Sequence, residues 1–148
     1  MDMVRVGAEH ASQMYYRLLV VEFKDESKGG RFIAEGLGMR RINVGEQLGA
    51  EMLEIPAKRR PLEVARLLEK HLGDVGNNGV LLDHIEILFE ATLKVEPLTL
   101  LMGVSRRHPV VVMWRGEIEA GNLLYGFPGH PEYRSYPARE VTLVRFPE

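Results

Sequence analysis

Four short apolar runs are the feature that most limits how this chain can fold. They are Arg17–Val21, Gly79–Asp83, Pro109–Trp114 and Val141–Phe146. The first three are continuously apolar rather than alternating, which is typical of strands covered on both faces, as in parallel sheets. A shorter run, Arg41–Val44, predicts a fifth strand at or near an edge of the sheet.

Helical patterns lie between these runs. Gly36 is expected to cap the first helix, and Leu62, Ala65, Leu68 and Leu72 are expected to line one face of the longest. Alternating strands and helices predict right-handed βαβ units, so we expect a single α/β domain over residues 1–148, with helices on both faces of a mostly parallel, about five-stranded sheet. The predicted helices are Ser27–Glu35, Glu46–Leu53, Pro61–Leu72, Pro97–Arg107 and a short one at Glu117–Leu124.

Composition excludes several classes of site. The 148 residues include no cysteine, which rules out disulfides and thiolate metal sites. The net charge of −2 gives no overall attraction to nucleic acid or anionic lipid. The N-terminal residues lack the apolar stretch of a secretory signal, and no run approaches the ~20 apolar residues of a membrane span. We therefore expect a cytoplasmic protein with no membrane partner.

The segment after the first apolar run is a candidate phosphate-binding loop. Aligned to G-x-x-x-x-G-K-[ST], Lys28 falls on the lysine, whereas Glu22 and Ser27 fall on the glycines and Gly29 on the Mg²⁺-binding hydroxyl. Lys28, Gly29 and Gly30 are then the candidate nucleotide-binding residues, on a loop that meets one of four fixed positions. The alternative is a plain strand–turn–helix with solvated charges.

The second run ends in a carboxylate, as the Walker B strand of P-loop NTPases does. Asp83 would bind Mg²⁺ and Glu86 would polarise the attacking water. Because a buried carboxylate is costly, Asp83 needs a partner; the alternative is an Asp that caps a turn. His84 is expected to be a turn histidine. Arg115, after the third strand, could contact a γ-phosphate or could simply be a basic residue at a strand end.

A Gly- and Pro-rich segment, Gly126–Pro137, predicts a rigid loop that contacts a partner. Its His130 and Tyr133 are candidate interface residues. Arg134 or Arg139 could reach the nucleotide of a neighbouring subunit in a homo-oligomer, as arginines do in ring-forming ATPases. The alternative is a loop that only packs over the sheet edge.

The chain resembles the BrxF family, the small P-loop proteins of type 3 BREX bacteriophage-defence systems. The resemblance is carried by Leu82–Phe89, Leu100–Arg106, Val110–Trp114, Gly126–Arg134 and, less specifically, Leu53–Leu62. It implies an AAA+ core-like P-loop ATPase fold that works with other BREX proteins, in systems that methylate host DNA and block phage replication. Lys28 would match the phosphate lysine, Asp83 the Walker B aspartate and Glu86 its neighbouring acid.

Three functions follow from these observations. The favoured one is a nucleotide-impaired BREX component that acts through protein partners. The first alternative is an oligomeric subunit that binds ATP and Mg²⁺ and is at most an ATPase. The second is a DNA-contacting module, for which the candidate residues are Lys58, Arg59, Arg60, Arg106 and Arg107.

Overall fold

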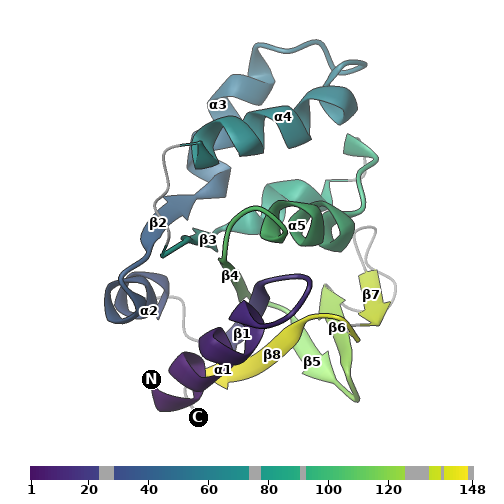
Figure 1. Ribbon diagram of the computed structural model, residues 1–148. Coiled ribbons are helices and arrows are strands. Elements are labelled where there is room, and N and C mark those ends of the chain that lie inside the picture. Colours follow the sequence, from purple (N-terminus) through teal and green to yellow (C-terminus); the bar gives the residue numbers. More distant parts are fainter. Residues whose placement is uncertain (24–28, 74–77, 91–92, 126–133, 138, 147–148) are drawn as a thin grey trace.

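Strands and helices alternate through most of the chain (Figure 1). The computed structural model describes residues 1–148 except 24–28, 74–77, 91–92, 126–133, 138 and 147–148. The elements are α1 (Asp2–Ser12), β1 (Leu18–Phe23), α2 (Gly29–Leu37), β2 (Arg40–Asn43), α3 (Val44–Leu53), α4 (Arg60–Leu72), β3 (Val80–Asp83), the 3₁₀ helix η1 (Ile85–Phe89), α5 (Pro97–Ser105), β4 (Val110–Trp114), β5 (Glu117–Glu119), β6 (Asn122–Tyr125), β7 (Arg134–Pro137) and β8 (Thr142–Phe146).

Five strands form one parallel sheet in the order β2-β3-β4-β1-β8. Every neighbouring pair in this sheet is parallel, which confirms the predicted α/β class. The fifth strand, β2, lies at one edge, as expected from its short and partly polar sequence. The other edge strand is β8. The three inner strands are buried along their whole length, which is why their sequences are continuously apolar.

Helices cover both faces of the parallel sheet. On one face, α1 and α2 pack on a cluster that includes Leu19, Val21 and Leu81. On the other face, α3, α4, α5 and η1 cover a larger cluster that includes Leu18 and Val20. These are the three layers visible in Figure 1. In the described part of the chain, no helix has both the length and the apolar character needed to cross a membrane.

The helices differ from the expected ones in several respects. α1 is a helix that the sequence patterns above do not predict. α2 continues through Gly36 and ends at Leu37; the left-handed residue after it is Gly38, at φ +67°. In α4 the buried face is formed by Val64, Leu67, Leu68 and Leu72. The prediction for Leu62 and Ala65 was wrong, because both are exposed, Leu62 by 81%.

The predicted helix at Glu117–Leu124 is instead a β-hairpin. β5 and β6 pair in antiparallel fashion, with Glu119 opposite Asn122. The two residues between them, Ala120 and Gly121, both have positive φ, at +50° and +80°. This is the backbone of the primed two-residue turn that favours hairpins. β7 adds a third antiparallel strand next to β6, so the predicted loop Gly126–Pro137 ends in a strand.

Aromatic side chains attach this small sheet to the domain. The Trp114 indole at the end of β4 donates a hydrogen bond of 3.0 Å to the Leu124 carbonyl. The Tyr125 ring stacks on Phe89, with 3.8 Å between ring centroids. Gly116 allows this approach, since a Cβ there would lie 1.8 Å from the Leu124 carbonyl oxygen. The small sheet therefore sits beside the carboxyl end of β4.

Candidate functional site

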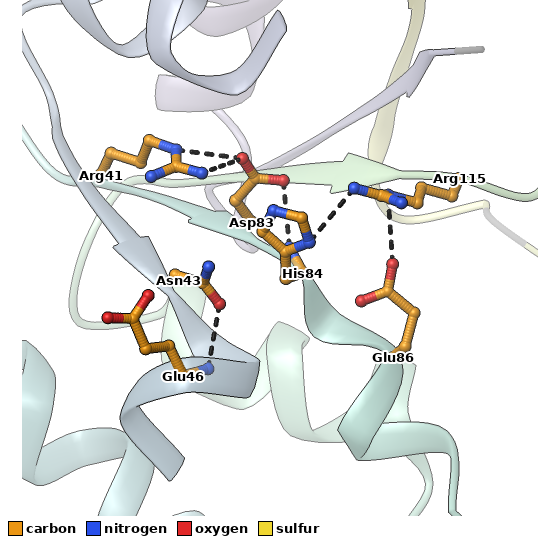
Figure 2. Close-up of polar contacts among 7 residues, drawn as sticks. All are labelled: Arg41, Asn43, Glu46, Asp83, His84, Glu86 and Arg115. Carbon is orange, nitrogen blue, oxygen red and sulfur yellow. Dashed lines mark hydrogen bonds and ion pairs between the residues drawn. The ribbon is translucent and has the colours of Figure 1, made fainter. Parts of the chain in front are cut away.

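The carboxyl ends of the parallel strands gather the predicted polar residues. Open α/β sheets place their ligand crevices at this edge. Asp83 ends β3, Glu86 lies in η1 just beyond it, and Arg115 follows β4. Figure 2 shows these three side chains together with His84 and with Arg41 from the edge strand β2. The structure thus brings together the residues expected at the ends of two separate strands.

Asp83 is buried, with 5% exposure, and both of its oxygens are engaged. Its Oδ2 accepts from Arg41 Nε at 3.0 Å and lies 3.0 Å from Arg41 Nη2. Its Oδ1 accepts from the His84 backbone N–H at 3.0 Å. The expectation that this carboxylate needs a partner is confirmed. The partner is a cation from the neighbouring strand, which compensates the cost of burying the charge.

The first turn of α2 lies against the same carboxylate. A Cβ built on Gly30 would be 2.3 Å from Asp83 Oδ2 and 3.5 Å from Arg41 Nε. Only glycine fits at this place without displacing the pair. Of the predicted nucleotide-binding residues, Gly29 and Gly30 therefore open a helix beside Asp83, whereas Lys28 lies outside the described residues.

Arg115, His84 and Glu86 form a second polar group beside the first. Arg115 Nη2 lies 3.1 Å from His84 Nδ1, and Arg115 Nε lies 3.1 Å from Glu86 Oε1. The guanidinium also lies over the Phe23 ring, 5.6 Å from its centroid. His84 has φ +54° at the junction of β3 and η1, so it is the turn histidine that we expected. Arg115 and Glu86 therefore form an ion pair that joins the end of β4 to η1.

Hydrogen bonds also connect the end of β2 and the start of α3 to the turn that follows Asp83. The Asn43 side chain accepts from the Glu46 N–H at 3.0 Å and caps α3 (Figure 2), and Gly45 N–H donates to the His84 carbonyl at 3.0 Å. These bonds join the start of α3 to the turn after β3. Sequence reasoning placed Arg41 in a strand but missed its role. The missing signal was the strand order, which makes β2 the neighbour of β3.

The position of Glu22 shows that the predicted start of the phosphate loop was wrong. The loop was expected to begin there, but Glu22 is an interior residue of β1 and only 2% exposed. Its carboxylate accepts from the Ile118 backbone N–H at 2.6 Å and from Arg145 Nε, and Arg145 is its register partner on β8. The carboxylate therefore joins β1 to β8 and to the small sheet. In the predicted alignment to a P-loop, Glu22 falls on the first glycine.

The predicted interface residues are only partly described. His130 and Tyr133 lie outside the described residues, and Arg134 begins β7. Arg139 is exposed in the turn between β7 and β8. The structure thus leaves the predicted contact with a neighbouring subunit untested.

Four of the five basic residues considered for DNA have partners within the chain, and the fifth, Lys58, is exposed. Arg59 lies 3.7 Å from Glu63, and Arg107 lies 3.8 Å from Glu69. The remaining contacts are those of Arg60 Nε with the Ile55 carbonyl at 2.9 Å and of the Arg106 guanidinium with the Tyr15 ring at 4.7 Å. Acidic neighbours reduce the positive field that DNA phosphates would meet.

The residues at the edge do not fit the Mg²⁺ that the resemblance implies. Asp83 Oδ2 is bound by Arg41, and Gly29 has no hydroxyl with which to coordinate a metal. Among the described residues, no group of three or more His, Asp or Glu side chains is arranged to hold a metal ion. The chemistry available here is that of paired fixed charges.

Comparison of this chain with protein-family models, with curated proteins and with solved structures found no match.

Proposed function

We propose that this chain is a P-loop-fold component of a BREX bacteriophage-defence system, impaired in nucleotide chemistry and acting through protein partners. Two observations support the family and fold parts. One is the resemblance to BrxF in sequence segments that follow one another in the same order between Leu82 and Arg134. The other is the strand order, in which β4 separates β1 from β3. P-loop ATPases of the AAA+ kind likewise place one strand between the phosphate-loop strand and the Walker B strand.

The proposal that nucleotide chemistry is impaired rests on the buried carboxylate of Glu22. A P-loop binds phosphates with backbone N–H groups that glycines leave free to converge. At the first glycine position this chain has a strand residue, whose carboxylate holds Arg145 and the Ile118 N–H. This position therefore offers a phosphate no free backbone donor, because the residue there is part of β1 and its side chain is committed to Arg145 and Ile118. We expect the loss of such charge-assisted bonds to cost several kcal/mol of phosphate binding.

Calorimetric titration with ATP and MgCl₂ tests this proposal. We expect no binding heat from the wild-type protein at any accessible ATP concentration, and the same result for Lys28→Ala. If the wild type bound ATP with micromolar affinity and Lys28→Ala lost that binding, the first alternative, an active oligomeric ATPase, would replace the proposal. Light scattering on the same samples would show whether assembly accompanies binding.

A defence assay tests the role in the cell. The chain is co-expressed with the other proteins of a type 3 BREX system, and the plaquing efficiency of a sensitive phage is measured. We expect removal of the chain to restore plaquing, and Lys28→Ala to protect as well as the wild type. A chain whose removal leaves protection unchanged would have no part in BREX defence.

A further inference from the structure

We propose that Arg41 is a built-in substitute for the divalent cation at the Asp83 edge, and that this edge is consequently indifferent to Mg²⁺. The inference rests on the proposed function, because it assumes that Asp83 holds the place of a Walker B aspartate. It deepens that function by naming the residue that supplies the positive charge in place of a metal.

The geometry around Asp83 is the first argument. One guanidinium approaches Oδ2 through both Nε and Nη2, each at 3.0 Å. The opposite side of that oxygen is closed by the backbone of α2, since not even a methyl group fits on Gly30. Oδ1 already accepts the His84 N–H. A hydrated metal ion would have to displace Arg41 before it could reach the carboxylate.

The chemistry of the guanidinium is the second argument. Arg keeps its charge at every accessible pH and presents planar donors that match a carboxylate. Mg²⁺ binds through carboxylates and retained waters, and gives up water reluctantly. With Arg41 in place, the pair is close to neutral, so a divalent cation gains little Coulomb energy there. The Arg41 side chain is 29% exposed and that of Asp83 is 7% exposed, so water screens this interaction only in part.

The position of Arg41 in the sheet is the third argument. It lies on β2, two residues before Asn43, the register partner of Asp83. Side chains two residues apart on a strand share a face, and a long side chain reaches the diagonal neighbour on the next strand. Arg41 is therefore held over Asp83 by the sheet itself. A residue held in this way acts as a permanent cation rather than an exchangeable one.

Thermal unfolding in excess MgCl₂ or in EDTA tests the inference. We expect the wild-type Tm to be the same in both. Arg41→Ala should lower the Tm in EDTA by several degrees, because a buried carboxylate loses its cation. MgCl₂ should then restore part of that loss. The double variant Arg41→Ala with Asp83→Asn should lose the response to MgCl₂, and Arg41→Lys should stay indifferent to MgCl₂ because it keeps a charge at this position.

Two results would overturn the inference. One is a wild-type Tm that rises in MgCl₂ and ceases to do so in Asp83→Asn. The other is an Arg41→Ala variant that does not respond to MgCl₂. If Arg41→Ala does not fold, Arg41→Gln is titrated instead, since it keeps most of the side chain without the charge. A gain of MgCl₂ response in Arg41→Gln supports the inference, and no gain refutes it.

The proposed function can fail separately. ATP binding that is equally strong in MgCl₂ and in EDTA would refute the nucleotide-impaired function and would leave the role of Arg41 intact. A wild-type Tm that depends on MgCl₂ through Asp83, without ATP binding, would refute only the role of Arg41.

Discussion

The carboxyl edge of the parallel sheet holds two buried carboxylates, one where β1 lies beside β8 and one where β3 lies beside β2. Both are stabilised in the same way. Glu22 near the end of β1 is bound by Arg145 from edge strand β8, and Asp83 at the end of β3 is bound by Arg41 from edge strand β2. Each carboxylate also accepts one backbone N–H. In both cases an outer strand compensates the buried charge of an inner strand.

The two carboxylates differ in the face of the sheet to which they point. Glu22 shares a face of β1 with Leu18 and Val20, which belong to the larger core under α3, α4 and α5. Asp83 follows Leu81 and Leu82 on β3, and its face is that of Leu81, the face covered by α2. Glu22 therefore faces the small antiparallel sheet, whereas Asp83 faces the helix that follows the candidate loop. The same local chemistry therefore links β1 to β8 and the small sheet on one face, and β3 to β2 under α2 on the other.

The largest effect should come from removing the cation at the β8 end. Arg145→Ala leaves the 2%-exposed Glu22 carboxylate with only the Ile118 N–H. We expect a loss of about 3 kcal/mol in the free energy of unfolding, measured in urea; this is the lower end for a broken buried pair, because the Arg145 side chain is 65% exposed whereas that of Glu22 is buried. Arg66→Ala is the control, because Arg66 is as exposed as Arg145 but its partner Glu63 on α4 is 18% exposed rather than buried, so this pair should contribute less than ~1 kcal/mol. Equal losses in the two variants would contradict the structural role of Glu22.

Most of the parallel sheet was predictable from the sequence. Burial on both faces makes a strand continuously apolar, and such runs located β1, β3 and β4 to within two residues. The β5-β6 hairpin was not predictable in the same way. Its strands have three and four residues, too few to show a period, and their turn depends on positive φ at Ala120 and Gly121.

The sequence could predict which polar residues lie at the strand ends of the site. It could not predict the pairs that form only because of the order of the strands in the sheet. Asp83, Glu86 and Arg115 follow recognisable strands, so their proximity could be expected. The pairs Glu22–Arg145 and Arg41–Asp83 are 123 and 42 residues apart in sequence. Nothing local in the sequence indicates them, because each pair forms only once β8 lies beside β1 and β2 beside β3.

An intermediate effect should follow from crowding the Asp83 end. Gly30→Ala places a methyl carbon 2.3 Å from Asp83 Oδ2, so the carboxylate must move against the hold of Arg41. We expect a loss of about 2 kcal/mol, in the range of overpacked interiors. Gly103→Ala is the matched control. It lies in α5, where an added Cβ would meet no atom of the described residues within 4 Å outside its own stretch of helix, and alanine is the better helix former.

That pair of variants separates packing from helix propensity. Gly103→Ala should raise the free energy of unfolding by ~0.5–1 kcal/mol, the opposite sign to Gly30→Ala. If Gly30→Ala were also stabilising, α2 would not press on Asp83. The contrast between Asp83, packed against α2, and Glu22, bound to the small sheet, would then no longer be supported.

The smallest effect concerns a carboxylate outside the sheet, Glu51 on α3. Its hydrogen bonds with His71 and then Lys70, both on α4, lower its pKa below the ordinary value of 4.5. A lowered folded-state pKa means that the stabilisation is present above pH 4.5 and is lost as the pH falls through the folded value. Glu51→Gln should therefore cost less than ~1 kcal/mol at neutral pH, since the pair is partly exposed.

The pH dependence of this variant distinguishes a surface pair from the two edge carboxylates. Urea unfolding of wild type and Glu51→Gln should differ at neutral pH and converge as the medium becomes more acidic than the folded pKa. Glu35→Gln, on the exposed face of α2, is the control and should follow the wild type throughout. A difference that persists in acid would mean that Glu51 stabilises the α3–α4 contact by packing. The ionised carboxylate of Glu51 would then not be the source of the stabilisation, contrary to what its lowered pKa indicates.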